Sequence, residues 1–250
     1  MAKYIKVYGE RNTNTKYFSK LLELNLDIKE ISGVAPPSVI KIQKLLPGDE
    51  LVRDIYFYLT YARNLGWKHT CVKSVTQLQR YDLVNDDLVF VTITKNPYSW
   101  LLSLYRKPYH HAYTKRPDFI TFLQSPWKTL GRDGVNKQLN NPVELWNIKN
   151  RSYLQLNEGR ALNITTERLL ENPASIIEQM SVRFGINRLG GAFVNYESAT
   201  QDKRKDGSYY RDYYLNEKWK NDLPKLAIGL INDKLDRSLM SYFSYELLPV

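Results

Sequence analysis

The pattern of hydrophobic and polar positions changes period within the first 26 residues. Residues 4–8 (YIKVY) alternate and are rich in β-branched and aromatic side chains, which is typical of a strand. Residues 9–14 (GERNTN) are polar, and from residue 15 to 26 the apolar positions recur at helical spacing. The pattern predicts a strand, a tight polar loop and a helix. Such a loop points its backbone N–H groups and the positive end of the helix at one place, so we expect it to bind an anion such as phosphate or sulfate.

The same order of strand, loop and helix recurs twice. Residues 87–94 (DLVFVTIT) form a nearly continuous apolar run that predicts a strand buried on both faces; Pro97 ends it, and a helix is expected over 98–105. Residues 161–165 (ALNIT) predict another short buried strand, followed by a helix over 167–184. This repetition favours an α/β fold with a mainly parallel sheet.

The remaining segments predict a single domain over residues 1–250. Residues 107–141 are rich in Pro, Gly, Asn and aromatics, so we expect irregular or short-helical structure that caps the sheet and lines an acceptor site. A helix is expected over 145–156, a charged loop over 200–207, and two closing helices over 216–243, broken near Pro224. No linker divides the chain.

Composition and charge narrow the possible partners without choosing one. With 250 residues, 43% hydrophobic and 25% charged, the chain has the composition of an ordinary soluble globular protein. A net charge of +10 favours an anionic partner: nucleotide, nucleic acid, acidic glycan or membrane surface. Cys71 is the single cysteine, so no internal disulfide can form. There is no apolar run of signal-peptide or bilayer-spanning length, and we expect a cytoplasmic protein without a membrane span.

The loop at residues 9–16 (GERNTNTK) departs from the Walker A phosphate-binding pattern. Asn14 replaces the second glycine of that pattern, and Thr15 and Lys16 stand in reversed order. Asparagine tolerates left-handed backbone angles, so the turn can still form. Thr13 and Thr15 offer hydroxyl groups, and Arg11 and Lys16 offer charge. The alternative is a polar connection with a routine threonine cap.

A second polar pair follows the predicted central strand. Lys95 lies at the carboxyl end of that strand, and Ser103 lies eight residues further on, in the next helix. Open α/β sheets bind ligands at this edge, so both side chains are candidates for one phosphate. The alternative is a solvated lysine and a serine that packs in the helix.

Together the two segments resemble the sulfotransferases that use 3′-phosphoadenylyl sulfate (PAPS). Residues 11–17 resemble the family's loop for the 5′-phosphosulfate, and Lys95-Asn96-Pro97 with Ser103 resembles its motif for the 3′-phosphate. Residues 164–173 (ITTERLLENP) resemble a third segment, with Thr166 where tyrosine is usual, and residues 213–245 resemble the family's closing helices. A late loop that also serves the 3′-phosphate is similar to Arg204, Lys205, Asp206 and Gly207.

The resemblance implies a P-loop-NTPase-like sulfotransferase fold, with a central mainly parallel β-sheet flanked by helices. It implies in-line transfer of a sulfuryl group from PAPS to a hydroxyl or amine of a small-molecule or glycan acceptor, with adenosine 3′,5′-bisphosphate (PAP) as product and no metal. The residues that it places around the donor are Arg11, Asn12, Thr13, Asn14, Thr15, Lys16, Tyr17, Lys95, Ser103, Thr166, Arg204, Lys205 and Gly207.

Catalytic roles are also suggested by the resemblance. His69 has the place of the family's base, and an ordinary imidazole suits proton acceptance near neutral pH; Glu30 is the alternative base. Asn12 aligns with the usual loop lysine, so Arg11 and Lys68 are the candidate cations for the transferred group. Tyr17 aligns with a tryptophan and would either stack on the adenine or belong to the core.

Two other functions remain open. A P-loop kinase or NTPase would need magnesium ligation and a lysine where Thr15 stands. A non-catalytic module that binds a nucleotide, nucleic acid or anionic glycan would rely on a basic surface, but the basic residues are spread along the chain. We therefore expect no nucleic-acid partner.

Overall fold

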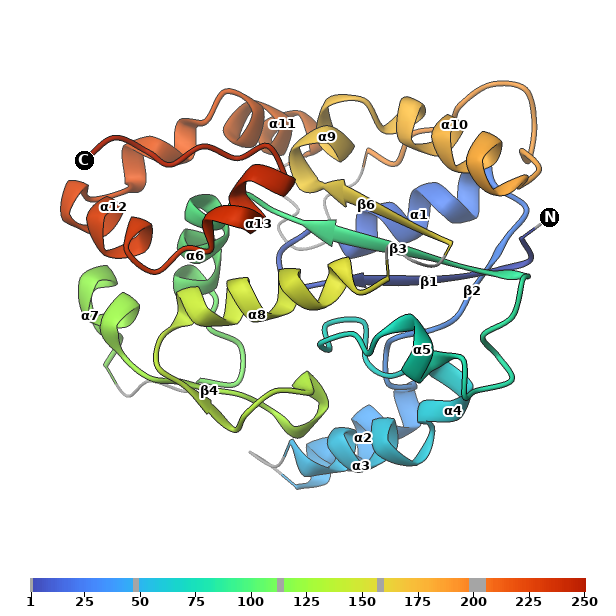
Figure 1. Ribbon diagram of the computed structural model, residues 1–250, viewed down its shortest axis with the longest axis horizontal. Helices are drawn as coiled ribbons and strands as arrows, with labels where there is room; N and C mark the ends of the chain where they lie inside the picture. The colour runs from blue at the N-terminus through green and yellow to red at the C-terminus, as the bar shows by residue number, and fades with distance from the viewer. Residues whose placement is uncertain (1, 47–49, 112–114, 157–159, 198–205) are drawn as a thin grey trace.

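A four-stranded parallel sheet lies at the centre of the computed structural model, which describes residues 2–46, 50–111, 115–156, 160–197 and 206–250 (Figure 1). The strand order is β2-β1-β3-β6, and all three pairs are parallel. The strands of this sheet are β1 (Tyr4–Gly9), β2 (Lys29–Glu30), β3 (Leu88–Thr94) and β6 (Ala161–Thr165). A separate antiparallel pair consists of β4 (Trp127–Lys128) and β5 (Gln138–Leu139).

The register brings the carboxyl ends of the three longer strands together. Gly9, the last residue of β1, pairs with Ile93, and Thr94, the last residue of β3, pairs with Thr165 of β6. The segments that leave these strands therefore start side by side, at the edge where open α/β sheets bind ligands. The predicted α/β class with a mainly parallel sheet is confirmed.

Helices surround this sheet. They are α1 (Thr15–Asn25), α2 (Pro37–Leu45), α3 (Leu51–Leu59), α4 (Tyr61–Asn64), α5 (Val75–Leu78), α6 (Pro97–Arg106), α7 (Phe119–Gln124), α8 (Pro142–Leu154), α9 (Thr166–Glu171), α10 (Pro173–Phe184), α11 (Gly207–Leu215), α12 (Lys225–Asn232) and α13 (Arg237–Tyr242), with 3₁₀ turns η1 (Gly131–Asp133) and η2 (Lys218–Asp222). No helix among the described residues is both long and apolar enough to cross a membrane.

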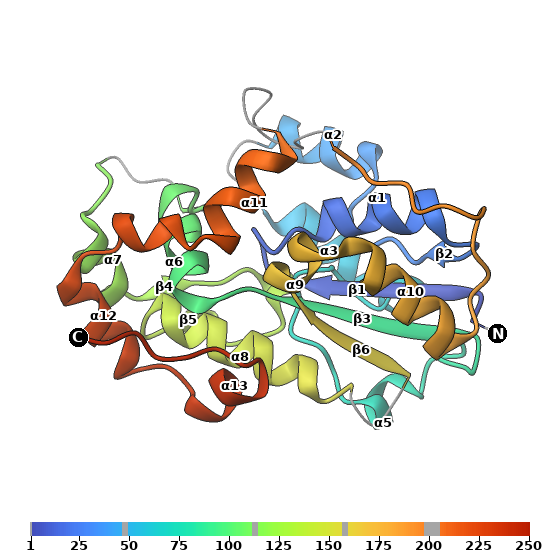
Figure 2. The same ribbon diagram turned by 90° about the horizontal axis from the view of Figure 1, so that it is seen from above.

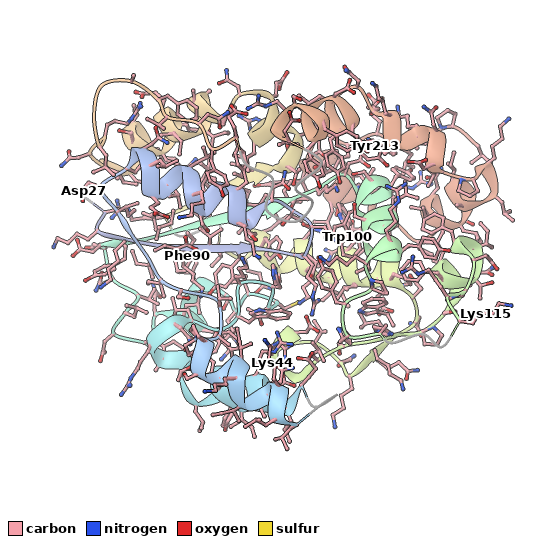
Figure 3. The ribbon with its side chains drawn as sticks, turned by 180° about the vertical axis from the view of Figure 1, so that it is seen from behind. Asp27, Lys44, Phe90, Trp100, Lys115 and Tyr213 are labelled. Atoms are coloured by element: carbon pink, nitrogen blue, oxygen red, sulfur yellow. The ribbon has the colours of Figure 1, made fainter. Side chains whose placement is uncertain are left out.

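Alternation along the strands builds a core on each face of the sheet. Val7 of β1 packs in one cluster with α1, α9 and α10. Tyr8 and Phe90 point to the opposite face, which is covered by α8 and the segment around α5. Burial of these side chains is the main stabilising contribution to the sheet. Phe90 and Trp100, labelled in Figure 3, are buried, whereas Lys44 and Lys115 are exposed.

A third apolar cluster lies beyond the carboxyl edge of the sheet. It joins α6, α7, α8, α12 and α13 around Trp100, Trp127 and Trp146. Figure 2 shows these helices gathered at the end of the molecule that also holds the C-terminus. The cluster supports the segments that leave β3 and thereby fixes one wall of the site described below.

Several predicted helices differ from the structure. The helix expected over 167–184 is two helices, because Pro173 cannot donate an N–H group and Asn172 caps α10 by accepting from the Ser175 N–H. Residues 216–243 contain η2, α12 and α13 rather than two helices. The helices predicted over 98–105 and 145–156 are present as α6 and α8, each starting at a proline.

Candidate functional site

The loop between β1 and α1 has a backbone that few residues can adopt. A Cβ on Gly9 would lie 2.7 Å from Thr13 Oγ1 and 2.9 Å from the carbonyl oxygen of Ile93, so only glycine fits there. Asn12 (φ 68°) and Asn14 (φ 61°) are left-handed, a conformation that asparagine tolerates better than most residues. The Walker-like turn therefore forms with asparagines in the positions that need it.

Hydrogen bonds hold this loop from within and from α6. Thr13 Oγ1 donates to the carbonyl oxygen of Glu10 (2.6 Å), so this hydroxyl is used inside the loop. Trp100 Nε1 donates to the carbonyl oxygen of Arg11 (2.9 Å), and Tyr109 OH donates to Asn12 Oδ1 (2.6 Å). The loop is thus fixed before any ligand binds, which lowers the entropy cost of binding.

The Trp67–His69 segment is joined to the loop through Gly9. The Gly9 N–H donates to the carbonyl oxygen of Lys68 (2.9 Å), and His69 Nδ1 is hydrogen-bonded to the carbonyl oxygen of Gly9. Since a carbonyl only accepts, Nδ1 carries the proton and a neutral His69 leaves Nε2 with a free lone pair. Burial, and then the charges of Lys68 and Arg11, lower the pKa of His69 well below its ordinary value of 6.5. The imidazole is therefore neutral at physiological pH.

A cavity of about 760 Å³ opens over this loop. Its walls come from the start of α1, from α3, from the segment before α5, from the segment after α6 and from η1. The lining residues include Arg11, Asn12, Asn14, Thr15, Lys16, Tyr17, Glu50, Arg53, Lys68, His69, Arg106, Lys107, Tyr109, His110, His111, Arg116 and Arg132. Cations and imidazoles dominate this surface, which makes it suited to an anionic ligand.

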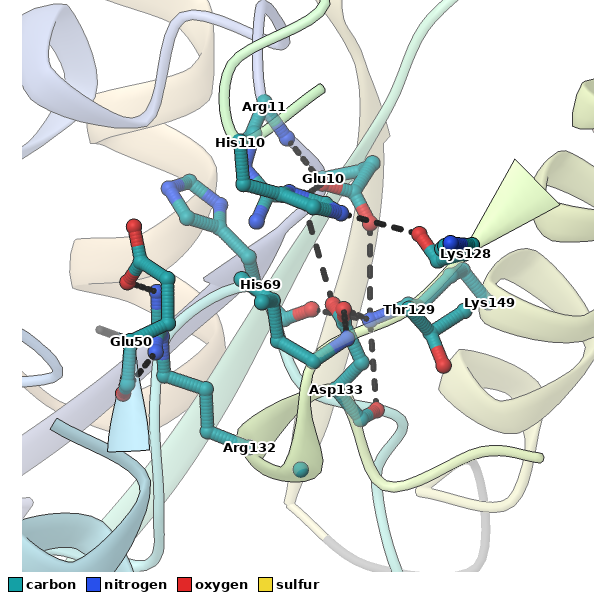
Figure 4. A network of polar contacts seen from close by, with 12 residues as sticks. Glu10, Arg11, Glu50, His69, His110, Lys128, Thr129, Arg132, Asp133 and Lys149 are labelled. Atoms are coloured by element: carbon teal, nitrogen blue, oxygen red, sulfur yellow. Dashed lines mark hydrogen bonds and ion pairs between the residues drawn. The ribbon is translucent and has the colours of Figure 1, made fainter. Parts of the chain in front are cut away.

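Below the loop, four buried charges form a closed network (Figure 4). Lys149 Nζ lies 2.9 Å from Asp133 Oδ1 and 3.4 Å from Glu10 Oε2. Arg11 NH1 lies 3.3 Å from Glu10 Oε1 and 3.9 Å from Asp133 Oδ1. Burial alone would raise the pKa of Asp133, but the charges of Lys149 and Arg11 outweigh it and hold this pKa at about 2. The network ties the loop after β1 to η1 and α8.

A second ionic cluster builds the wall that faces the loop (Figure 4). Arg132 NH2 lies 2.5 Å from Glu50 Oε2, and Arg132 NH1 lies 2.7 Å from Asp54 Oδ1. Glu50 Oε2 also accepts from Arg53. The guanidinium groups of Arg11 and Arg132 lie 4.5 and 4.6 Å from the centre of the Trp67 ring, so this tryptophan joins the loop to the opposite wall by cation–π contacts.

His110 and His111 also line the cavity and are anchored to β4. Each ring donates through Nε2 to the carbonyl oxygen of Lys128, at 2.8 and 2.9 Å, and His111 stacks on Trp127. Burial lowers the pKa of His110 to about 4 and also lowers that of His111. Both imidazoles are therefore neutral wall residues at pH 7.

Lys95 and Ser103 are brought together by β3 and α6. Lys95 Nζ donates to Ser103 Oγ (2.9 Å) and lies 3.8 Å from the centre of the Tyr214 ring on α11. Only 1% of Lys95 is exposed, so Tyr214 covers its ammonium group. Burial would raise the pKa of Tyr214, but the charge of Lys95 and hydrogen bonds to Lys95 and Ser103 lower it overall. The pair predicted for one phosphate is thus adjacent, beneath a tyrosine lid and outside the lining of the cavity.

The other predicted site residues have different surroundings. Tyr17 lines the cavity but is half-buried against the sheet core and donates from its hydroxyl to Asn195 Oδ1 (2.7 Å). Thr166 is fully buried at the start of α9 and does not line the cavity. Glu30 lies outside the cavity lining; burial raises its pKa, and Lys68 and Lys6 act against this rise. Gly207 begins α11, and Arg204 and Lys205 lie outside the described residues.

Several charged residues of the site are not apparent in the sequence pattern. They are Glu10, Glu50, Arg53, Arg132, Asp133 and Lys149. Glu10 adjoins the predicted loop, but the others come from segments between 50 and 149 that carry no known motif. The one local signal is the GRDG sequence at 131–134, whose final glycine has a left-handed φ of 69°.

Comparison with known proteins returns sulfotransferase structures. No family model and no curated protein matches the chain. The sulfotransferase domain from the Synechococcus PCC 7002 olefin synthase is 15% identical, with a TM-score of 0.47, over 100% of this chain and 96% of that one. The sulfotransferase domain from the curacin biosynthetic pathway is 14% identical (TM-score 0.46; 99% of each chain). Mouse sulfotransferase SULT7A1 complexed with PAP is 12% identical (TM-score 0.49; 98% of this chain and 89% of that one).

Proposed function

We propose that this protein transfers a sulfuryl group from PAPS to an acceptor hydroxyl or amine. The observation that carries the proposal is the position of Gly9. This residue belongs to the loop that would hold the phosphosulfate, and both its N–H group and its carbonyl oxygen are hydrogen-bonded to the Lys68–His69 segment. A cation and a neutral imidazole thus lie beside the loop, within the lining of one cavity.

The residues present suit the donor in three respects. Lys16 and Lys68 bring charge to the rim of the loop, and Asn12 Nδ2 is buried without a hydrogen-bond partner, so it can donate to an added oxygen. Lys95 and Ser103, an ammonium group and a hydroxyl 2.9 Å apart, would bind the 3′-phosphate. Arg11 is already paired with Glu10 and Asp133, so Lys68 is the better candidate for charge that develops on the leaving group.

The reaction would follow from these positions. The acceptor oxygen or nitrogen forms a bond to sulfur while the bond from sulfur to the bridging oxygen of PAPS breaks, which leaves PAP. The acceptor's proton passes to Nε2 of His69, whose lone pair is available because Nδ1 holds the proton bonded to Gly9. The transfer uses only cations, a base and rigid positioning, as in phosphoryl transfer.

Binding of PAP tests the donor site directly. Wild type should be stabilised against heat by PAP, and Lys95→Ala and Ser103→Ala should each bind PAP at least about tenfold more weakly, the cost of losing a charge-assisted hydrogen bond. Lys20→Ala is the matched control, because Lys20 is exposed on α1 and pairs only with Glu23 among the described residues. Equal stabilisation of wild type and Lys95→Ala would refute the donor site, and magnesium-dependent ATP binding would favour a kinase. Transfer from labelled PAPS to panels of glycans and phenols then tests the activity.

A further inference from the structure

Cationic side chains line the cavity away from the loop as well as beside it. Eight of its lining residues are Lys or Arg, and Glu50 is the one acidic lining residue among those that the structure describes. Lys16 and Lys68 lie on the loop side, where the phosphosulfate would bind. Arg53, Arg116 and Arg132 belong to other segments; Glu50 and Asp54 offset two of their three charges, which leaves about one positive charge for another ligand.

Ion pairs hold two of these guanidinium groups, those of Arg53 and Arg132, in place. Glu50 Oε2 accepts from both Arg53 and Arg132, and Asp54 fixes Arg132 from a second side. Arg116 lies with its guanidinium 5.7 Å from the centre of the Tyr105 ring. A preorganised wall of this kind binds carboxylate and sulfate groups well, because guanidinium offers paired donors in a plane.

Buried N–H donors without partners also indicate a ligand with acceptor oxygens. Among the described residues, Arg53 Nε and Arg132 Nε are buried nitrogens without a hydrogen-bond partner, and both belong to arginines that line the cavity. A buried donor left unsatisfied is costly, and native proteins usually supply a partner from water or ligand. Two unsatisfied N–H donors on arginines that line one cavity suit a ligand that brings acceptor oxygens.

We propose that the acceptor is itself an anion, with a carboxylate or a sulfate ester near the group that is modified, and that the Arg53–Arg116–Arg132 wall binds this charge. The inference rests on the proposed function for the identity of the reaction, and on the wall alone for the charge of the ligand. An acidic saccharide and a small aromatic acid share this chemistry.

Matched pairs of ligands that differ only in charge test the proposal. One pair is a uronic-acid oligosaccharide and its carboxyl-reduced counterpart; the other is hydroxyphenylacetate and its amide. Calorimetry in the presence of PAP should show that the acidic member of at least one pair binds about tenfold or more tighter than the neutral member, and labelled PAPS should show the same preference in kcat/KM. The pair that responds identifies the saccharide or the small acid.

Variants locate the effect. Arg53→Gln and Arg116→Gln should each reduce the preference for the acidic member severalfold and leave the affinity for PAP unchanged, whereas Lys41→Gln, an exposed charge on α2 outside the cavity lining, should change neither. Equal binding of acidic and neutral members in both pairs, or a preference unaffected by both arginine variants, overturns the proposal. Failure of transfer with a preserved binding preference would overturn the proposed reaction and leave the anionic ligand standing.

Discussion

Nδ1 of His69 is bonded to the carbonyl oxygen of Gly9, so the proposed base is positioned by the loop that it serves. His69→Asn should preserve this bond through its amide N–H and remove Nε2. We expect kcat for sulfuryl transfer to fall about 100-fold or more, which is the usual range for loss of a general base, and the affinity for PAP to stay unchanged. Steady-state kinetics beside PAP titration checks this; a variant with wild-type kcat would exclude His69 as the base.

The pH profile should also report His69. Because its pKa is lowered, the imidazole stays deprotonated below its ordinary value of 6.5, and activity should decline only when pH falls through the lowered pKa. The measurement is kcat/KM from pH 5 to 9. An acidic limb centred near 6.5 would mean that another group, or a more solvated histidine, controls the rate.

Lys149 is a fully buried cation whose loss should strongly destabilise the protein. Lys149→Met leaves the carboxylates of Asp133 and Glu10 with less compensating charge beneath the loop. We expect the free energy of unfolding to fall by about 3–5 kcal/mol. Urea denaturation gives the value. The control is Lys20→Met, which breaks an exposed pair with Glu23 and should cost less than about 1 kcal/mol. Similar losses for the two variants would contradict the assigned role.

Gly9 should tolerate no side chain. Gly9→Ala places a Cβ within 2.9 Å of the Ile93 carbonyl oxygen, a backbone atom that cannot rotate away. Strain of this kind costs about 1–3 kcal/mol and should also shift the loop and weaken PAP binding. Gly191→Ala is the control, since nothing lies within 4 Å of its added Cβ. Thermal unfolding and PAP titration of both variants decide the matter.

Tyr214 covers Lys95 and should slow the entry of the nucleotide. Tyr214→Ala removes a buried cation–π contact worth up to ~2 kcal/mol, so the association rate of PAP should rise by as much as about 30-fold. Stopped-flow binding measures it, and Tyr209→Ala, on the same helix, is the control. An unchanged or lower rate would show that Tyr214 does not hinder access.

Local sequence patterns predicted the elements that carry the loop and the Lys95 motif. Residues 4–8, 88–94 and 161–165 are strands, and their runs of apolar side chains suit strands of a parallel sheet that is buried on both faces. The break at Asn172 was not predicted, since the apolar face of 176–184 continues the spacing of Leu169 and Leu170. A proline with a capping residue before it outweighed that periodicity.

The site was less predictable than the fold. Loop residues could be named because backbone conformation is a local property, as Gly9 and Asn14 illustrate. The ionic partners of Arg11 could not be named from the sequence. Asp133 is separated from Arg11 by more than a hundred residues, and the role of Asp133 depends on η1 lying beside α8. Ion pairs between residues far apart in the chain produce no periodic pattern in the sequence, so the roles of Arg132 and Lys149 can be recognised only from the structure.

The pairing of β1 has a consequence for how the protein folds. Gly9 is held by Lys68 and packed against Ile93, so the loop takes its shape only after segments about 60 and 80 residues away have docked. Contacts of such sequence separation form slowly, because the entropy of closing the intervening chain must be lost first. The site should therefore be assembled late in folding, and intermediates with formed helices should lack affinity for PAP.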